Sequence, residues 1–222
     1  LRDGLAEEYN RRWLKVLTGR VFTSIEKTKA GLLGQLSDGS RIETDQIMFA
    51  IGRSPNTVGL GLEKAGVERG WDGHVVVDAA SRSNVDNIYA VGDVTDRVQL
   101  TPVAIREGHA FADSVFGSKP WTVDHAMIPT AVFSTPEIGT VGLPEHLARE
   151  RCRQLDIYKA RFRPMKGTLS GRQERMVMKL LVDADTDKVL GCHILGPDAG
   201  EMVQIAAIAL RMGATKADFD GT

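Results

Sequence analysis

The chain has 222 residues, of which 42% are hydrophobic and 26% are charged, as is usual for globular domains with a sizeable core. Its net charge of −1 indicates neither a nucleic-acid nor an anionic-membrane partner, and no apolar run approaches the ~20 residues of a membrane-spanning helix. The two cysteines, Cys152 and Cys192, are far apart in sequence, which argues against a disulfide scaffold and a C-x-x-C redox motif. These features predict a cytoplasmic protein with reduced thiols.

The first part of the chain is expected to contain short strands separated by turns. An amphipathic pattern over residues 1–12 favours a helix, and residues 60–65 favour a shorter one. The expected strands are residues 21–25, 31–36, 47–52 and 75–78. A turn at Asp38-Gly39 closes the second strand, and a turn at residues 71–74 precedes the fourth. The run at 47–52 is continuously apolar, which predicts a fully buried strand.

The stretch from Asn87 to Val94 predicts a short buried strand that breaks at Gly92 and Asp93. Gly92 allows the backbone to approach a ligand or a neighbouring strand closely. Asp93 would lie at the carboxyl end of the strand, where open α/β sheets bind ligands. Thr101 then provides an N-cap for a helix with proline at its first position. A carboxylate would thus lie near a helix N-terminus that favours negative charge, although a loop aspartate without further role is the alternative.

From Met127 the pattern changes to successive strands followed by one long helix, which predicts a separate α+β domain. The expected strands are residues 130–133, 139–142, 156–160, 176–182 and 189–195. The expected helices are residues 102–116, 145–153 and 199–212. Asp198 and Glu201 predict a capping box at the start of the last helix. That helix is apolar around so much of its circumference that we expect it in a core or against another subunit.

Two segments carry a family resemblance, Tyr89-Ala90-Val91-Gly92-Asp93 and Leu100-Thr101-Pro102-Val103-Ala104. They resemble the second flavin-binding segment of the class I pyridine nucleotide-disulfide oxidoreductases, and residues 50–56 resemble the link that precedes it. The similarity covers nearly the whole chain. It implies the α/β end of a two-dinucleotide-binding flavoprotein followed by an α+β dimerisation domain. By this resemblance the chain is a C-terminal fragment: residues 1–50 end the NAD(P)H-binding domain, 51–125 belong to the FAD-binding domain, and 126–222 form a truncated dimerisation domain.

The resemblance also implies residues that bind FAD. Asp93 would bind the ribityl chain, and the helix that begins at Thr101 would face the pyrimidine edge of the flavin. The amides of Val103 and Ala104 would stabilise the charge that gathers there on reduction. The implied cofactor-binding residues are Gly92, Asp93, Leu100, Thr101, Pro102, Val103 and Ala104.

Candidate substrate residues also come from the resemblance. Residues 162–171, which include Met165, resemble the glutathione reductase branch. Met165 matches a position that lines the glutathione pocket in some members, but a core methionine that fills a gap is the alternative. His109 falls where some members have an arginine for a glutathione carboxylate, and an exposed histidine without a role is the alternative. Arg106, one helical turn earlier, would compensate. His74 and His193 have no metal-ligating neighbour in sequence, so we predict no metal site.

The implied complete enzyme is a homodimer that passes a hydride from NADPH to FAD, and then electrons through an active-site disulfide to glutathione disulfide. The chain has no Cys-x4-Cys pair and no G-x-G-x-x-G motif. We therefore expect no catalytic residue in it and no activity from it alone. One alternative is a relative that acts on a dihydrolipoamide-type or trypanothione-type disulfide. Another is a non-catalytic dimerisation module derived from a flavoprotein.

Overall fold

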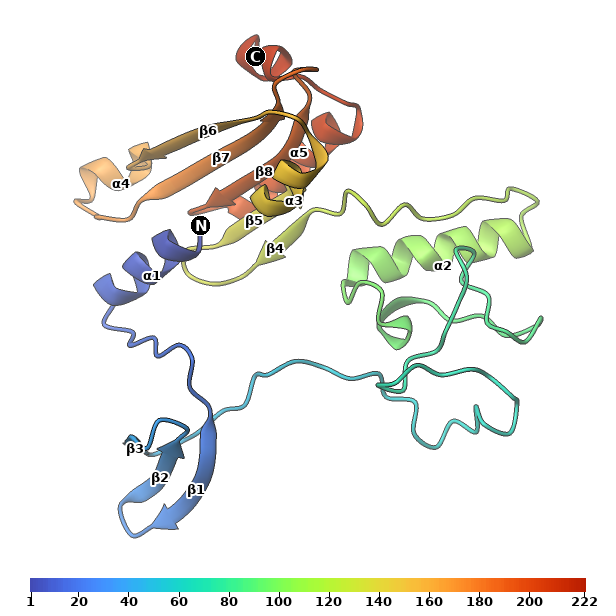
Figure 1. Ribbon diagram of the computed structural model, residues 1–222, viewed down its shortest axis with the longest axis horizontal. Coiled ribbons are helices and arrows are strands. Elements are labelled where there is room, and N and C mark those ends of the chain that lie inside the picture. Colours follow the sequence, from blue (N-terminus) through green and yellow to red (C-terminus); the bar gives the residue numbers. More distant parts are fainter. The chain divides into compact units, whose positions relative to one another are not determined.

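The computed structural model describes all residues from 1 to 222, and their contacts divide the chain into two units (Figure 1). The sheet unit comprises residues 1–23, 36–40 and 126–222. The loop unit comprises residues 24–35 and 41–125. No helix is both long enough and apolar enough to cross a membrane.

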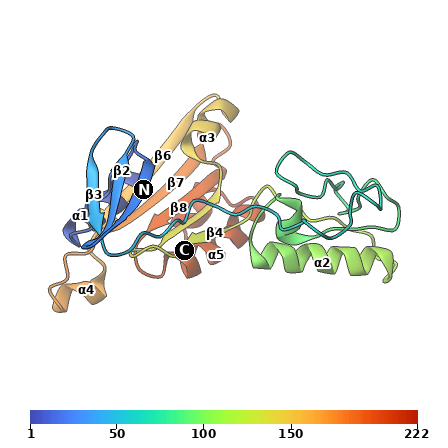
Figure 2. The ribbon, with the colours of Figure 1, turned by 90° about the horizontal axis from the view of Figure 1, so that it is seen from below.

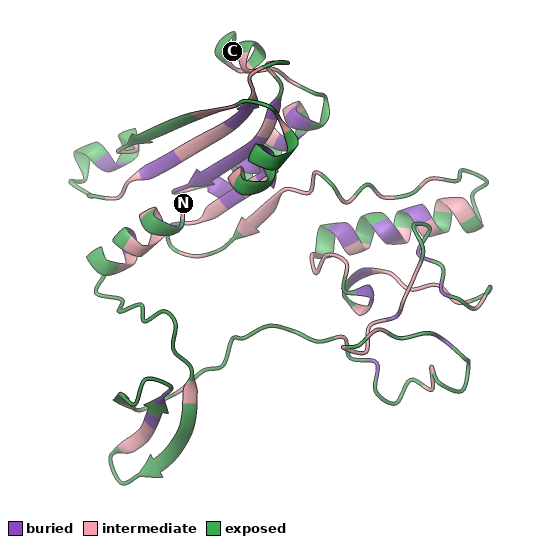
Figure 3. Cartoon of the chain, in the orientation of Figure 1, coloured by how far each residue is buried: buried purple, intermediate pink, exposed green.

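The sheet unit is built on an antiparallel sheet of five strands in the order β4-β5-β8-β7-β6. These strands are β4 (Thr130–Val132), β5 (Ile138–Gly142), β6 (Leu155–Phe162), β7 (Met176–Asp183) and β8 (Val189–Leu195). The expected hairpin across the acidic turn is confirmed, with Lys179 opposite His193. Buried positions concentrate along β7 and β8, which carry the middle of the core (Figure 3).

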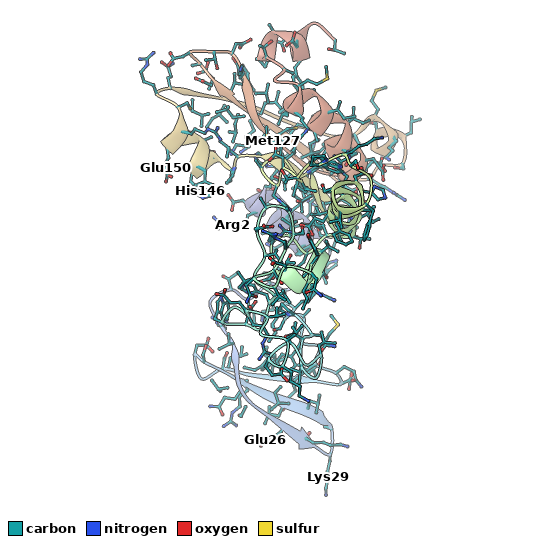
Figure 4. The ribbon with its side chains drawn as sticks, turned by 90° about the vertical axis from the view of Figure 1, so that its right-hand side faces the viewer. Arg2, Glu26, Lys29, Met127, His146 and Glu150 are labelled. Carbon is teal, nitrogen blue, oxygen red and sulfur yellow. The ribbon has the colours of Figure 1, made fainter.

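Two helices lie on opposite faces of this sheet, α3 (Glu145–Arg151) and α5 (Ala199–Arg211) (Figure 1 and Figure 2). One stripe of α5 is buried in the core, and it consists of Ala199, Val203, Ala207 and Leu210. Close packing requires a glycine in β5, because a Cβ at Gly139 would lie 2.3 Å from the Ala199 carbonyl oxygen. On α3, His146 and Glu150 point away from the sheet (Figure 4).

A second side of α5 is not covered. Ile205 is 71% exposed and Met212 is 83% exposed, and Ile208 is also exposed. The expectation of a deeply buried helix is therefore met on one face only. One apolar face of α5 contacts the core, and the other is open to solvent. An exposed apolar face of this kind is typical of an interaction surface.

Helix α1 (Arg2–Arg11) packs into the sheet unit through a buried carboxylate. Glu8 is 3% exposed and accepts hydrogen bonds from Arg11 at 2.7 Å and from the Arg175 amide at 3.3 Å. The short helices α4 (Met165–Leu169) and α6 (Lys216–Asp220) were not predicted from the sequence. Both have only five residues, too few for a visible period of apolar positions.

The capping box expected at Asp198 and Glu201 is wrong. Asp198 adopts a left-handed conformation with φ of 62°, and its side chain caps no amide. The Asp198 carboxylate instead binds Lys166 at 2.6 Å. A capping box does occur at α6, where Thr215 and Asp218 bond reciprocally.

A small sheet of three strands lies earlier in the chain, in the order β1-β2-β3. The strands are β1 (Phe22–Thr28), β2 (Gly31–Leu36) and β3 (Arg41–Thr44). The predicted turn at Asp38-Gly39 is confirmed, since the Gly39 amide donates to Leu36 at 2.9 Å. The buried strand expected at 47–52 is wrong, because this segment is irregular and Ile51 is 89% exposed. An apolar strand of this kind is stable only between neighbouring strands, and no strand of the chain pairs with it.

Between β3 and α2 (Thr101–Val115), the loop unit has little regular structure. The strands expected at 75–78 and 87–91 are wrong, since they form only the isolated bridges Arg69–Val75 and Arg82–Tyr89. The helix expected at 60–65 is also wrong. Three glycines with positive φ, Gly59, Gly61 and Gly66, interrupt that segment, and the chain forms turns instead. This part of the loop unit is therefore held by turns and by contacts to α2.

Glu145 joins α3 to the sheet and gives a pH-dependent contribution to stability. It binds Lys179 at 2.5 Å and Arg149 at 2.7 Å, and these partners lower the pKa of Glu145 from 4.5 to about 2. A lowered pKa in the folded state stabilises the fold above the unfolded pKa, and this contribution is lost as pH falls toward 2.

We predict that Glu145→Gln lowers the free energy of unfolding by about 0.5–1 kcal/mol at pH 7, a modest value because the side chain is partly exposed. The difference from wild type should shrink as pH falls from 4.5 to about 2. Chemical denaturation at several pH values measures both effects, with exposed Glu150→Gln on the same helix as the control. A difference that is independent of pH would contradict the assignment.

Candidate functional site

The loop unit brings the Gly92 turn against the first turn of α2. Residues Gly92–Thr95 form a short 3₁₀ helix, and Gly92 has a φ of +73°. A Cβ at Gly92 would lie 2.8 Å from the Cβ of Ala104. Both the conformation and the space therefore require glycine at this position. The residue that follows, Asp93, is consequently held beside the N-terminus of α2.

Asp93 is accessible and faces a charged partner. Its side chain is 50% exposed, and its carboxylate lies 3.9 Å from the guanidinium of Arg53. Arg53 belongs to residues 50–56, the link singled out in the sequence. The structure thus brings together two of the segments that carry the family resemblance.

The start of α2 differs by one residue from the expectation. Leu100 is the N-cap, and Thr101 is the first helical residue, so the Thr101 hydroxyl caps no amide. The amides of Val103 and Ala104 both donate to the Leu100 carbonyl oxygen at 3.0 Å. The structure shows no acceptor for the Thr101 amide. That N–H, together with the dipole of the helix, makes this end favourable for an anionic or carbonyl oxygen.

Sequence analysis missed the buried carboxylate of Glu107, which lies in the middle of the buried stripe of α2. Glu107 is 2% exposed, accepts two hydrogen bonds and forms an ion pair with Arg97. The Gly92 amide donates at 2.6 Å and the His125 ring Nε2 at 2.8 Å, and the Arg97 guanidinium lies 2.9 Å from the carboxylate. Its position between Val103 and Ala110 on one helical face was the signal that could have identified it.

A ring of hydrogen bonds encloses the Gly92 backbone. The Thr95 hydroxyl donates to the Gly92 carbonyl oxygen at 2.8 Å and accepts from Arg97 at 3.3 Å. Arg97 in turn binds Glu107, which accepts from the Gly92 amide. Both polar groups of the Gly92 backbone are therefore satisfied inside the unit.

The predicted substrate residues lie on exposed surfaces. Arg106 stacks on the ring of Trp121 at 5.1 Å from the centroid, and His109 is exposed on the same helix. Met165 belongs to α4 of the sheet unit and is 89% exposed, so it fills no gap in the core. Their binding of substrate stays a prediction.

The expectation that His74 has no metal-ligating neighbour is wrong in space. Asp72, His74 and Asp96 each place one possible ligand atom within 4.8 Å of the others. The Asp72 carboxylate is hydrogen-bonded to the His74 ring, which lowers the pKa of Asp72. Asp96 accepts from the Gln99 side chain at 2.6 Å. Contacts within the protein thus account for this arrangement. The sequence did not reveal it because Asp96 is more than 20 residues from Asp72 and His74.

The remaining histidine and cysteine candidates are structural. His193 is buried, which lowers its pKa, and its Nε2 donates to the Leu143 carbonyl at 3.0 Å. Its Nδ1 therefore accepts from the Thr140 hydroxyl at 2.5 Å. Burial raises the pKa of Cys192 to about 11, so its thiolate is not accessible near neutral pH.

A cavity of about 600 Å³ lies in the sheet unit. Its charged lining residues are Arg12, Glu137, Lys166, Arg172, Glu174 and Asp198. Arg12 is paired with Glu174 and Lys166 with Asp198, each at 2.6 Å. Because these charges largely compensate one another, the cavity has no set of convergent groups of one sign and no perturbed nucleophile. We therefore place the candidate site at the Gly92 turn.

Comparisons with known proteins assign the family. Residues 128–222 match the model of the pyridine nucleotide-disulphide oxidoreductase dimerisation domain, and residues 1–108 match the pyridine nucleotide-disulphide oxidoreductase model. The chain belongs to the pyridine nucleotide-disulphide oxidoreductase family. The predicted fold class and family resemblance are thereby confirmed.

Several relatives match the whole chain. A glutathione reductase of Burkholderia cepacia is 47% identical over 100% of this chain and 49% of its own length. A trypanothione reductase of Leishmania donovani is 40% identical over 100% of this chain and 46% of its own length. The chain spans about half the length of the curated relatives it matches.

Solved structures agree with this assignment. The HOCl-induced flavoprotein disulfide reductase RclA from Escherichia coli has a TM-score of 0.88 and 26% identity. That match covers 96% of this chain and 49% of the RclA chain. LpdA from Mycobacterium tuberculosis has a TM-score of 0.83 and 26% identity, and covers 98% of this chain and 48% of its own.

We predict that Gly92→Ala destabilises this family member more than Gly39→Ala. Both glycines have positive φ, but a Cβ at Gly39 meets no atom within 4 Å. In both variants, alanine in a left-handed conformation lowers the free energy of unfolding. Gly92→Ala also forces an overlap with Ala104, which should lower it by about 1–3 kcal/mol more. Chemical denaturation of the two variants measures the difference. Equal losses of stability would show that Gly92 is not pressed against α2.

Proposed function

We propose that this chain is part of a flavin-dependent disulfide reductase that uses NADPH and FAD to reduce glutathione disulfide. The support comes from the curated relatives named glutathione reductase, at 46–48% identity. The domain boundaries predicted above belong to this proposal. Residues 1–50 would end the NAD(P)H-binding domain, 51–125 would complete the FAD-binding domain, and 126–222 would form the dimerisation domain.

The observation that carries the flavin assignment is the packing of Gly92 against Ala104. This packing holds the backbone of Asp93 beside the first turn of α2, where a ligand can meet both the carboxylate and the helix N-terminus. The half-exposed Asp93 carboxylate suits a ribityl hydroxyl, and the free Thr101 amide suits an oxygen of the flavin ring. These groups fit the cofactor. Bound FAD would supply the relay of electrons between NADPH and a disulfide.

The predicted cofactor residues then have separate tasks. Gly92 sets the backbone distance, and Asp93 fixes the cofactor by a charge-assisted hydrogen bond. The amides of Val103 and Ala104, predicted to stabilise the flavin edge, donate to Leu100 in this structure, and in the proposal the Thr101 amide takes over this task. Pro102 donates no hydrogen bond, and its fixed φ favours the first turn of the helix.

Trypanothione disulfide is the second candidate substrate, because trypanothione reductases are 38–40% identical to this chain. Glutathione disulfide carries more carboxylates, which require cationic partners. Arg106 is the one arginine of α2, which has no lysine, and His109 would contribute little charge when neutral. Stacking of Arg106 on Trp121 orients its guanidinium without neutralising it.

We also propose a homodimer. The support is the exposed apolar side of α5, formed by Ile205, Ile208 and Met212, which lies within the residues 128–222 that match the dimerisation-domain model. A two-fold interface would place the same surface of both subunits together. Cys152 and Cys192 are free thiols, which supports the predicted cytoplasmic location.

The direct test is an assay of the complete protein that contains this chain. Purified protein should carry FAD and oxidise NADPH when glutathione disulfide is added. Trypanothione disulfide and dihydrolipoamide with NAD⁺ are the comparison substrates. A protein without FAD and without turnover on any disulfide would contradict the proposal and favour the non-catalytic module.

We predict that Asp93→Ala weakens FAD binding by about 1.5–3 kcal/mol, the cost of one charge-assisted hydrogen bond. Equilibrium dialysis of the complete protein against FAD measures the loss. Asp86→Ala is the control, because the Asp86 side chain is 98% exposed and lies in the same unit. FAD retention equal to that of wild type would remove Asp93 from the site.

We predict that Ile205→Asp converts the complete protein from dimer to monomer or unfolds the dimerisation domain, because a charge would be buried against the partner subunit. Leu169→Asp is the control, since Leu169 is fully exposed on α4. Sedimentation velocity separates the two cases. A native dimer of the Ile205→Asp variant would place the interface elsewhere.

A further inference from the structure

Glu107 joins three separate segments of the loop unit at one buried side chain. The Gly92 amide comes from the turn before α2, Arg97 from the loop that leads into it, and His125 from the segment that follows it. All three donate to the same carboxylate, which is 2% exposed. A buried carboxylate is stable only when donors compensate for its lost hydration, and here each oxygen has at least one.

We propose that Glu107 is a positioning residue for the flavin, acting through Gly92. The inference rests on the proposed function, because it assigns a task toward the same cofactor. Glu107 fixes the Gly92 amide from one side, and Thr95 fixes the Gly92 carbonyl from the other. The peptide groups on both sides of Gly92 are thereby immobilised. Asp93, the next residue, is held in the direction that cofactor binding needs.

The carboxylate is required for this task, and its amide analogue is a poor substitute. Two oxygens of Glu107 accept from Gly92, Arg97 and His125. Glutamine has one acceptor oxygen, and its NH₂ group would face either the Gly92 amide or the side chains of Arg97 and His125. Either orientation sets donor against donor. The turn would then relax, and FAD would have to order it on binding.

The chain offers a matched control in the other unit. Glu137 also accepts from a glycine amide, that of Gly200 at 3.2 Å, at the start of α5. Glu137→Gln therefore makes the same Glu-to-Gln change beside a glycine amide without touching the Gly92 turn. A general loss of stability would weaken FAD binding in both variants. A positioning role would weaken FAD binding only in Glu107→Gln.

The experiment uses the complete protein, stripped of FAD and titrated with FAD while flavin fluorescence and the visible spectrum are recorded. We expect Glu107→Gln to raise the dissociation constant for FAD about 10- to 100-fold and to change the flavin spectrum toward that of free flavin. Glu137→Gln should bind FAD as wild type does. Thr95→Val, which removes only the hydroxyl that holds the Gly92 carbonyl, should raise the constant about 3- to 10-fold.

Wild-type affinity and spectrum in Glu107→Gln would overturn the inference while leaving the proposed function intact. If Glu107→Gln does not fold, Thr95→Val decides: weaker FAD binding supports the positioning role, and unchanged binding overturns it. A similar loss of FAD affinity in Glu137→Gln would show that the effect reflects general stability, and would overturn the inference as well. Wild-type protein that binds no FAD would overturn the proposed function, and the inference with it.

Discussion

The close packing of Gly92 on Ala104 is the constraint on which the loop unit depends. A residue with a side chain cannot adopt this position, so the chain must pass the start of α2 with bare backbone. Bare buried backbone needs hydrogen-bond partners, and Glu107 and Thr95 supply them. The close packing of Gly92 therefore requires the hydrogen bonds with Glu107 and Thr95. Asp93, the residue that follows, remains half exposed.

The sheet unit is held in a different way, by a ladder of antiparallel strands and one apolar face of α5. Small residues on both sides bring helix and sheet together: Gly139 lies under Ala199, and Ala207 continues the stripe. The same helix has a second apolar side that the unit leaves exposed. In the proposed homodimer this side would become buried, because apolar surface leaves water when two copies meet.

Much of the sheet unit could be predicted because its signals are local. Strand β8 has the predicted bounds, and the hairpin with β7 follows from an acidic turn between two apolar runs. The loop unit could not be predicted in this way. Residues 47–52 have the pattern of a buried strand but no strand beside them, and pairing is a property of the whole sheet. Glu107 was missed for a related reason, since its three donors lie 10 to 18 residues away in sequence. Gly92 and Asp93 were identified because their motif encodes a close approach.

The most direct measurement is a crystal structure of the complete protein with FAD bound. The expected result is an Asp93 carboxylate oxygen within about 3 Å of a flavin hydroxyl, with the Gly92 amide still bonded to Glu107. The Thr101 amide should face the flavin ring in the same structure. An Asp93 side chain directed into solvent, or a Gly92 turn separated from α2, would contradict the central claim that this packing builds the cofactor site.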